Sequence, residues 1–507
     1  MNVDYHALLP ELILGSTVLA VLAADLFRIQ KYWTAVIGMI GIFLAFIPVL
    51  TLGLCESLEF CAEPLGGQRV LFGGSYVVDT FSLVLKGLFL GSTFIAVLLS
   101  VGYIEQDRYW QGEFYFLMLS SALGALVLAS SRDLVTLFVG LELVTGPTFL
   151  LAGWRKGDPR SNEAALKYFI IGVLSAAILL FGMSLVYGYT GELTFAGIRA
   201  ATAQLGESSL LTIGVVLTLL GFAFKVSAVP FHFWTPDTYE GAPIPVTAYL
   251  SVVSKTAGFV GLLTLSYQAF AELRNVWGPL LWILAALSMT VGNLIAVRQD
   301  DIVRLLGYSS IAQGGFILVP FGAAVASNPT PDQLQTAFFA TVTYLLIYAV
   351  MNLGAFAVVI AGANRIKSTA IDDWGGLGSY APGLAGLLAL FFASLAGIPP
   401  IAGWFAKLVM FSSVLGVDSG WATALAIIAV INSVIAFYYY ARVIKAAWFD
   451  PVPDAIPAGE LQGMGRSVAP SLQLALVLTA IGVLVLGIYP DLIADVGDVA
   501  STVAGGF

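Results

Sequence analysis

The chain alternates between long apolar runs and short polar segments along nearly its whole length. Each apolar run is about 20 residues long, the length that an α-helix needs to cross the hydrocarbon core of a bilayer. The period-two alternation that is typical of membrane barrel strands is absent from these runs. The pattern therefore predicts an all-α integral membrane protein of about 14 transmembrane helices. The expected spans are 8–27, 33–54, 78–103, 112–130, 132–152, 163–188, 209–240, 244–270, 277–297, 302–321, 336–361, 382–415, 421–448 and 468–489.

The composition agrees with this prediction. Of the 507 residues, 59% are hydrophobic and 10% are charged, whereas soluble domains carry roughly 25% charged residues. The loops between the spans leave no room for a soluble domain, and no cleavable signal peptide is expected at the N-terminus. The net charge of −9 is spread over the loops and argues against nucleic acid as a partner. The lipid bilayer is the expected environment of the chain.

The basic residues predict the orientation of the chain. The loops after odd-numbered spans hold thirteen lysines and arginines, and the loops after even-numbered spans hold four. Because basic loops stay on the cytoplasmic side, the odd-numbered loops are expected in the cytoplasm and both termini outside. The other five of the 22 basic residues lie inside the spans, and all are lysines: Lys86, Lys167, Lys225, Lys255 and Lys407. Lysine can release its proton when it is desolvated, whereas arginine stays charged, so this set suits reversible protonation.

Two spans are expected to be broken by proline, which removes a backbone donor and clashes with the preceding turn. Pro230 interrupts the seventh span and Pro399 interrupts the twelfth. The segment KVSAVPFHFW around Pro230 resembles SLAGIPPIAGW around Pro399, at an offset of 169 residues. SRDLVTLFVG likewise resembles QDDIVRLLGY, with Asp133 opposite Asp301 at an offset of 168. Each aspartate starts a span and is expected to be a helix N-cap.

The two matches predict an internal repeat of five helices. An odd number of helices inverts the second copy in the membrane, and inverted repeats with a broken helix in each half are typical of secondary transporters. The expected units are three N-terminal helices in 1–110, a first repeat in 111–272, a second repeat in 273–449 and a last helix in 450–507.

Glu142 and Lys225 are the first candidates for proton chemistry. Glu142 lies at the centre of the fifth span, where a charge costs at least roughly 2.5–3.5 kcal/mol and needs a partner or water. Lys225 precedes Pro230 by five residues, and broken backbone at membrane depth survives where it lines a wet cavity. We interpret both as titrating groups. A static ion pair of Glu142 and the capping of freed carbonyls by Lys225 are the alternatives.

Lys255 and Lys407 are the next candidates. Lys255 lies about ten residues into the eighth span, too deep to reach the surface, and Lys407 follows Pro399 by eight residues. The repeat aligns Ser394, rather than Lys407, with Lys225, so the two halves place lysine on opposite sides of their breaks. A purely structural role stays open for each lysine.

Three further residues are weaker candidates for the proton path. Lys167 lies a few residues into the sixth span and could reach the cytoplasmic interface by snorkelling. Lys86 lies outside the repeat. His232 lies in the first break, where it could relay protons or could hydrogen-bond to the opened backbone.

No cofactor or metal site is expected in this chain. It has two histidines and two cysteines, whereas haem, iron–sulfur and zinc sites need clusters of these residues. No phosphate-binding glycine-rich motif is present. Cys55 and Cys61 lie on the predicted outer side and could form a local disulfide if that compartment is oxidising.

Four stretches carry a resemblance to a known family: KVSAVPFHFWTPDTYEGAPIPV, RLLGYSSIAQGGFIL, EAALKYFIIG and GIPPIAGWFAK. Residues 75–450 resemble the antiporter-like proton-channel subunits of respiratory complex I, which are related to subunits of multi-component cation/proton antiporters. The resemblance implies two inverted repeats and a proton path along a polar central axis. It matches Glu142, Lys225, Lys255 and Lys407 to the functional glutamate and lysines of the family. Lys407 favours the N-type subunit, because the M-type carries glutamate there.

One position departs from the family. Gln313, in YSSIAQGGF, stands where many relatives have histidine. Glutamine cannot titrate, so this side chain is expected only to orient water or a lysine. The departure argues against a histidine-dependent link between the two half-channels.

The resemblance implies a proton-translocating subunit in the membrane arm of a bacterial NADH:quinone oxidoreductase. It would belong to the enzyme without carrying redox chemistry, so NADH, FMN, iron–sulfur clusters and quinone are expected in partner subunits. The expected partners are the M-type antiporter-like subunit and the small K-, J- and A-type subunits in the bacterial inner (cell) membrane. The alternative is a subunit of a cation/proton antiporter. A Na⁺ site would need several oxygen ligands together, and the spans offer few acids besides Glu142.

Overall fold

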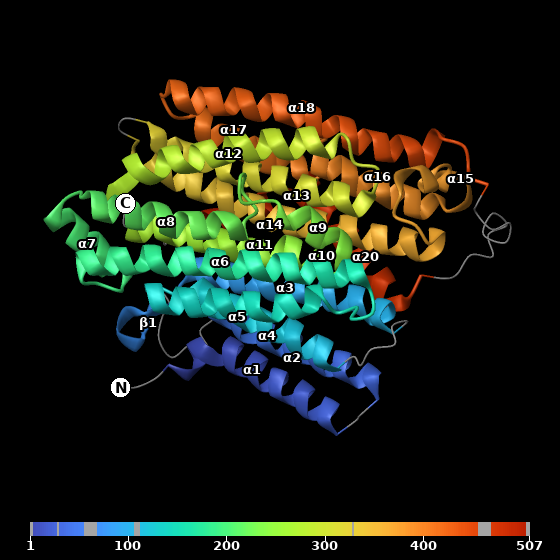
Figure 1. Cartoon of the computed structure of the whole chain (residues 1–507), viewed down its shortest axis with the longest axis horizontal. Coiled ribbons are helices and arrows are strands. Elements are labelled where there is room, and N and C mark those ends of the chain that lie inside the picture. The colour runs from blue at the N-terminus through green and yellow to red at the C-terminus, as the bar shows by residue number, and fades with distance from the viewer. Residues whose placement is uncertain are drawn as a thin grey trace.

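The structure, a computed structural model, describes residues 4–27, 30–54, 68–105, 112–326, 329–454 and 468–502. Its long helices lie roughly side by side in a bundle, with the first helices on one flank and α18 (Gly420–Phe449) on the other (Figure 1). In the described residues, twelve helices are long and apolar enough to cross a membrane. The all-α membrane fold predicted from the apolar runs is confirmed.

The first three long helices are accompanied by a small hairpin. The helices are α1 (Tyr5–Leu26), α2 (Lys31–Leu54) and α3 (Thr80–Ile104). Between α2 and α3, the chain forms two antiparallel strands joined by a turn: β1 (Arg69–Leu71), η1 (Phe72–Gly74) and β2 (Tyr76–Val78). The sequence predicts only a loop here, because strands of three residues are too short to show a period-two pattern.

The next six helices include the first break, which lies between the last two of them. They are α4 (Gly112–Ser130), α5 (Leu134–Ala152), α6 (Pro159–Thr190), α7 (Phe195–Leu205), α8 (Ser209–Lys225) and α9 (Trp234–Gly241). α7 has eleven residues and is too short to span a membrane. It lies with β1 at one end of the bundle (Figure 1).

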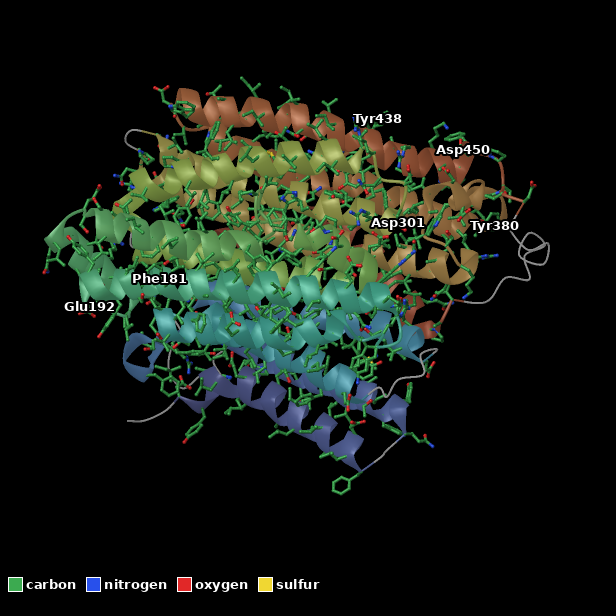
Figure 2. The ribbon with its side chains drawn as sticks, viewed as in Figure 1. Phe181, Glu192, Asp301, Tyr380, Tyr438 and Asp450 are labelled. Carbon is green, nitrogen blue, oxygen red and sulfur yellow. The ribbon has the colours of Figure 1, made fainter. Side chains whose placement is uncertain are left out.

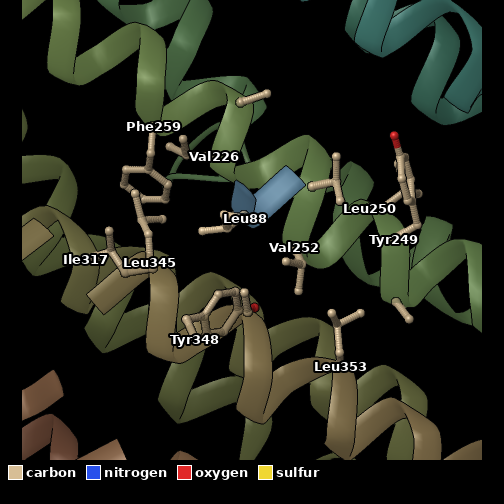
Figure 3. Packing of buried hydrophobic residues seen from close by; sticks show 14 of the residues in the cluster. Leu88, Val226, Tyr249, Leu250, Val252, Phe259, Ile317, Leu345, Tyr348 and Leu353 are labelled. Carbon is tan, nitrogen blue, oxygen red and sulfur yellow. The ribbon is translucent and has the colours of Figure 1, made fainter. Parts of the chain in front are cut away.

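A buried central segment follows. It consists of α10 (Ile244–Tyr249), the π-helical turn η2 (Leu250–Ser254), α11 (Lys255–Thr264) and a second π-helical turn η3 (Leu265–Ala269). All residues from 244 to 267 are buried. Figure 3 shows Val252 of this segment beside Tyr348 and Leu353 of α14 (Pro331–Ile366). Lys255 therefore starts α11 in the interior of the protein.

The remaining elements complete the bundle and contain the second break. They are η4 (Ala271–Leu273), α12 (Arg274–Ala296), α13 (Ile302–Leu318), η5 (Val319–Val325), α14, η6 (Ile371–Trp374), α15 (Leu377–Tyr380), α16 (Pro382–Ala396), α17 (Gly403–Leu415), α18, α20 (Pro470–Ile488) and α21 (Asp491–Thr502). Neither α15 nor α21 is predicted from the sequence, because neither is a long apolar run.

Both predicted breaks are present. Between α8 and α9 the chain leaves the helix for residues 226–233, and between α16 and α17 it does so for residues 397–402. One residue turns into the left-handed region at each helix end, Ser227 at φ 61° and Gly397 at φ 90°. The two breaks therefore start with the same change of backbone direction.

The hydrogen bonds that close the two helix ends are also alike. At the end of α8, the N–H of Ala228 donates to the carbonyl of Ala223 at 2.8 Å, and at the end of α16, the N–H of Ile398 donates to the carbonyl of Ala393 at 3.1 Å. This five-residue return is the pattern of a helix closed by a left-handed residue. Pro230 and Pro399 therefore lie after the ends of α8 and α16, which are closed by these backbone hydrogen bonds.

Asp133 and Asp301 are N-caps, as predicted. Asp133 accepts from the N–H groups of Val135 and Thr136 at 2.8 and 2.9 Å, and Asp301 accepts from the N–H of Arg304 at 2.9 Å. Each aspartate also forms an isolated β-bridge with a distant residue, Asp133 with Thr194 and Asp301 with Ala370. The two caps are thus alike in their contacts, and the five-helix repeat itself stays a prediction. The boundaries of the predicted units and the exact number of spans stay predictions.

The flanks of the bundle are apolar and its ends carry charge. Phe181 of α6 and Tyr438 of α18 lie on the flanks and are each 59% exposed. Glu192 and Asp450 lie towards opposite ends of the bundle (Figure 2). Lipid tails therefore fit the flanks, and water fits the two ends.

Candidate functional site

Lys225 is the last residue of α8 and reaches across to α5 and α6. The residue is 3% exposed, and its ammonium donates to the Thr145 hydroxyl at 2.6 Å and to the Tyr168 hydroxyl at 3.3 Å. The Tyr168 ring stacks on Trp234, which begins the next helix after the break. Among the described residues, both hydrogen-bond partners of the ammonium are hydroxyls. Lys225 therefore does not cap the freed carbonyls.

Glu142 lies on α5 one turn before Thr145 and is half-buried. Its carboxylate forms no ion pair within 4.0 Å in the part of the chain that the structure describes. Thr145 shares a helix face with Glu142 and a hydrogen bond with Lys225, so it connects the two groups. The static ion pair considered for Glu142 is therefore not found among the described residues.

Lys255 is 2% exposed and binds α13. Its ammonium donates to the backbone carbonyl of Ser310 at 2.6 Å and to the Ser310 hydroxyl at 2.5 Å. The same hydroxyl accepts from Tyr348 of α14 at 3.1 Å and lies 3.5 Å from the Tyr239 hydroxyl of α9. Lys255 thus faces a cluster of hydroxyl groups from three elements.

Two glycines allow the helices that carry Lys225 and Lys255 to pack closely. A Cβ atom at Gly258 of α11 would lie 3.1 Å from the Lys225 side chain. A Cβ atom at Gly314 of α13 would lie 3.1 Å from the Val226 carbonyl and 3.8 Å from the Lys255 ammonium. The end of α8 therefore packs against the two helices that hold Lys255.

Gln313 follows Ser310 by one turn of α13. Its carbonyl accepts from the Tyr344 hydroxyl at 2.7 Å. Its amide donates to the Leu395 carbonyl at 3.0 Å and to the Tyr440 hydroxyl at 3.4 Å. The partners of Gln313 among the described residues are two tyrosines and the end of α16, and no lysine is among them. The expected role in orienting water or a lysine stays a prediction.

Lys407 caps the second break. It is 7% exposed, and its ammonium donates to the carbonyl of Ala396, the last residue of α16, at 2.7 Å. The ammonium also lies 5.0 Å from the centre of the Phe316 ring of α13. Capping of a freed carbonyl, which the sequence suggests as an alternative for Lys225, is instead found at Lys407.

One face of α13 therefore runs past two of the lysines. Ser310 binds Lys255, Gln313 binds the carbonyl of Leu395, and Phe316 lies beside Lys407. The three residues follow each other at a spacing of three, which places them along one side of a helix. This face of α13, Ser310–Gln313–Phe316, therefore extends from the ammonium of Lys255 to that of Lys407.

Lys167 and His232 lie apart from this surface. The Lys167 side chain is 42% exposed and forms ion pairs with Glu163 at 2.6 Å and with Asp237 at 2.7 Å. Asp237 also binds Arg304 at 3.0 Å. The geometry matches the snorkelling alternative for Lys167. His232 lies between α8 and α9, and its Nδ1 atom is buried without a hydrogen-bond partner among the described residues.

A buried ion pair outside the repeat is not predicted from the sequence. Lys86 of α3 is fully buried, and its ammonium lies 2.8 Å from the carboxylate of Glu11 in α1 and 3.3 Å from the Tyr76 hydroxyl. The signal was an acid inside the first apolar run. The tyrosines around Gln313 were missed for a different reason, because tyrosine in an apolar run is indistinguishable from other core residues.

The described residues contain no group of three or more histidine, cysteine, aspartate or glutamate side chains that could hold a metal ion. Cys55 and Cys61, the candidates for a local disulfide, lie outside the described residues.

Comparison with known proteins identifies the family. A family model described as NADH:quinone oxidoreductase/Mrp antiporter, TM, matches residues 131–436. NADH-quinone oxidoreductase subunit N of Trichlorobacter lovleyi is 39% identical over 97% of this chain and 96% of its own length. The chain belongs to the subunit N family of NADH-quinone oxidoreductases. This confirms the resemblance found in the sequence.

Solved structures agree with membership of the subunit N family. A chain of respiratory complex I from Thermus thermophilus is 31% identical, with a TM-score of 0.76 and coverage of 96% of this chain and 98% of that one. A chain of the Mrp complex from Dietzia sp. has a TM-score of 0.82 and covers 99% of this chain and 97% of that one, at 20% identity. The second likeness shows a shared fold alone, so it does not favour the antiporter alternative.

Proposed function

We propose that this subunit N carries protons across the membrane as part of the membrane arm of NADH:quinone oxidoreductase, along a path formed by Glu142, Lys225, Lys255 and Lys407. The observation that supports the path is the surroundings of the three lysines. Each is at most 7% exposed, and in the described part of the chain each binds hydroxyls or a carbonyl rather than a carboxylate. A buried lysine without a fixed counter-ion can exist both charged and neutral.

The path starts at the first break. A change of charge near Glu142 alters the proton affinity of Lys225, with Thr145 as the shared neighbour. Moving one charge against 100 mV costs roughly 2.3 kcal/mol. The coupling must therefore change the proton affinity of the lysine by a free energy of about that size. Glu142 suits the role of receiver because it is half-buried, so a neighbouring subunit can approach it.

The path continues along the Ser310–Gln313–Phe316 face of α13. The Ser310 and Tyr348 hydroxyls lie beside Lys255, while the Tyr440 hydroxyl lies 2.5 Å from that of Ser309 and 3.4 Å from the Gln313 amide. A hydroxyl both donates and accepts, so a row of hydroxyls can pass a proton without any member carrying a net charge. These groups replace the histidine of related subunits in the proposed path.

The rest of the assignment follows from this role. The chain would take part in the enzyme without redox chemistry, with NADH, FMN, iron–sulfur clusters and quinone held by other subunits. Its neighbours would be the M-type antiporter-like subunit and the small K-, J- and A-type subunits of the bacterial inner membrane, with both termini of this chain outside. The relatives that share 36–41% of their residues with this chain are named as quinone oxidoreductase subunits, which supports this assignment over the antiporter.

Replacement of Lys225 tests the proposal. In the complete complex reconstituted into vesicles, Lys225→Ala is expected to abolish proton uptake coupled to this subunit, so the number of protons pumped per NADH falls. NADH oxidation with an artificial electron acceptor should be unchanged, because the redox cofactors lie elsewhere. Lys167→Ala is the matched control, since Lys167 is paired at the surface. Unimpaired pumping per electron in Lys225→Ala would contradict the proposed path.

A further inference from the structure

A basic cavity opens at the helix ends on the side that the distribution of lysine and arginine predicts to be cytoplasmic. Its volume is about 430 Å³, and its polar lining consists of Tyr103, Arg155, Asn364, Lys367, Ser368 and Thr369. Tyr103 and Asn364 lie in the last turns of α3 and α14, and the other four residues follow α5 or α14. No carboxylate is among the described residues that line it. The proton path does not use this cavity.

The two cations of the cavity are differently held. The Arg155 guanidinium donates to the Tyr103 hydroxyl at 2.5 Å and lies 5.1 Å from the centre of its ring, so its position is fixed against α3. Lys367 is the first residue after α14, and no ion pair involves its ammonium within the described ranges. Its φ of 64° is a backbone conformation that favours glycine. Backbone geometry alone therefore does not explain a lysine at this position.

An apolar crevice of about 110 Å³ adjoins the cavity and shares Tyr103, Asn364 and Lys367 with it. Its apolar wall is formed by Leu99, Ile360, Leu384 and Leu472, which come from α3, α14, α16 and α20. Arg365, near the end of α14, also lines it. The charged cavity and the apolar crevice together form one site with a basic mouth and a hydrocarbon wall. A free phosphate would occupy only the mouth, whereas an amphipathic anion would use both parts.

We propose that this site binds an anionic phospholipid of the cytoplasmic leaflet, with its phosphate in the cavity and part of an acyl chain in the crevice. Arg155 offers a planar fork of donors, which fits phosphate oxygens, and Lys367 adds a second charge. The Ser368 hydroxyl lies at the same mouth, whereas the Thr369 hydroxyl donates to the Asp301 carboxylate and is not available to a ligand. Basic pockets between helices on the cytoplasmic side are suited to lipid headgroups because that leaflet is rich in anionic lipid.

Lys367 has a second role that the test must separate. Its N–H donates to the Ala363 carbonyl at 2.8 Å, which closes α14, and its positive charge favours a helix C-terminus. Lys367→Gln keeps the N–H and removes only the charge. A loss of lipid binding in this variant at an unchanged unfolding temperature therefore does not arise from opening of the helix end.

The experiment compares the purified complete complex with the double variant Arg155→Gln/Lys367→Gln after removal of bound lipid in detergent. The double variant should need about tenfold more phosphatidylglycerol for half-saturation, the effect of removing two cations from one phosphate site. Bound lipid is counted by mass spectrometry of the extracted complex. Phosphatidylcholine should bind both proteins equally weakly. Lys156→Gln/Arg160→Gln is the control, because these residues lie near Arg155 without lining the cavity.

Leu384→Trp separates a lipid from a free anion and serves as an independent test if the double variant fails to assemble. The indole would fill the crevice while leaving both cations in place, so phosphatidylglycerol binding should fall and inorganic phosphate should not become a ligand. The proposal is overturned if phosphatidylglycerol binds the double variant and the wild type equally. It is also overturned if millimolar inorganic phosphate displaces all anionic lipid and Leu384→Trp has no effect. Proton pumping is measured separately, so failure of either proposal is recognised by itself.

Discussion

The two breaks in the bundle share a backbone and differ in the lysine. At both, a left-handed residue and a five-residue return bond end the first helix. Lys225 precedes its break and turns away to hydroxyls of α5 and α6, whereas Lys407 follows its break and binds the last carbonyl of α16. The same interruption thus leaves one lysine among exchangeable partners and fixes the other to the backbone.

A buried lysine can either bind exchangeable hydroxyl groups, as Lys225 does, or cap a backbone carbonyl, as Lys407 does. Among the described residues, no backbone carbonyl depends on the Lys225 ammonium, because both of its partners are hydroxyls. The Thr145 hydroxyl itself donates within its own helix, to Leu141 at 2.7 Å. Lys407 stabilises the break itself, so a change of its hydrogen bond also changes the end of α16. Variants at the two breaks should therefore separate stability from pumping.

The largest effect is expected at Gly397. A Cβ atom there would lie 2.7 Å from the Lys407 side chain, and φ is 90°. Gly397→Ala should destabilise the subunit by about 2–5 kcal/mol through left-handed strain and overpacking, and should lower the yield of assembled complex. Ser227→Gly is the counterpart at the first break and should assemble normally, since glycine accepts φ of 61°. Thermal unfolding of the purified complexes measures the stability of both variants. If Gly397→Ala and Ser227→Gly unfold at the same temperature, the left-handed residue at the second break does not need to be glycine.

A smaller effect on stability is expected at Lys407. Lys407→Met leaves the Ala396 carbonyl without its ammonium partner, which should cost about 1–3 kcal/mol. Lys225→Met should cost less, because both of its partners are hydroxyls with other bonds. The unfolding temperatures of the two variants show which substitution costs more stability. If Lys225→Met is the less stable one, the assignment of duties is reversed.

The smallest structural effect is expected at Thr145. Thr145→Val keeps the shape and removes the hydroxyl that accepts from Lys225. The cost in stability should be about 0.5–1.5 kcal/mol, while protons pumped per NADH should fall because Glu142 and Lys225 lose their shared neighbour. Thr218→Val in α8 is the control, since in the described part of the chain that hydroxyl donates within its own helix, to Gly214 at 2.7 Å. Pumping at the wild-type ratio in Thr145→Val would remove Thr145 from the path.

Much of this architecture could be predicted from the sequence because it depends on local signals. Apolar length predicts the spans, Pro230 and Pro399 mark the breaks, and aspartate before an apolar run predicts the caps at Asp133 and Asp301. The burial of Lys225, Lys255 and Lys407 also follows from their position in apolar runs. Each of these features is determined within one or two turns of chain.

The partners of the buried groups could not be predicted, because they come from distant parts of the chain. Lys225 binds a residue 80 positions away, and the Gln313 amide binds one 82 positions away. Which hydroxyl meets which ammonium depends on how helices rotate and pack, and no local pattern encodes that rotation. Lys86 and Glu11 likewise meet only after α1 and α3 are assembled.

The π-helical turn before Lys255 acts as a register shift. Leu250–Ser254 is wound more loosely than the α-helix on either side, so the turn holds one residue more than an α-helical path would need. Each residue of an α-helix advances the side-chain direction by about 100°. Without the extra residue, Lys255 would face a different neighbour and not Ser310. A deletion of one apolar residue between 250 and 254 would therefore disconnect the lysine as completely as replacing it, although every polar group of the chain would still be present.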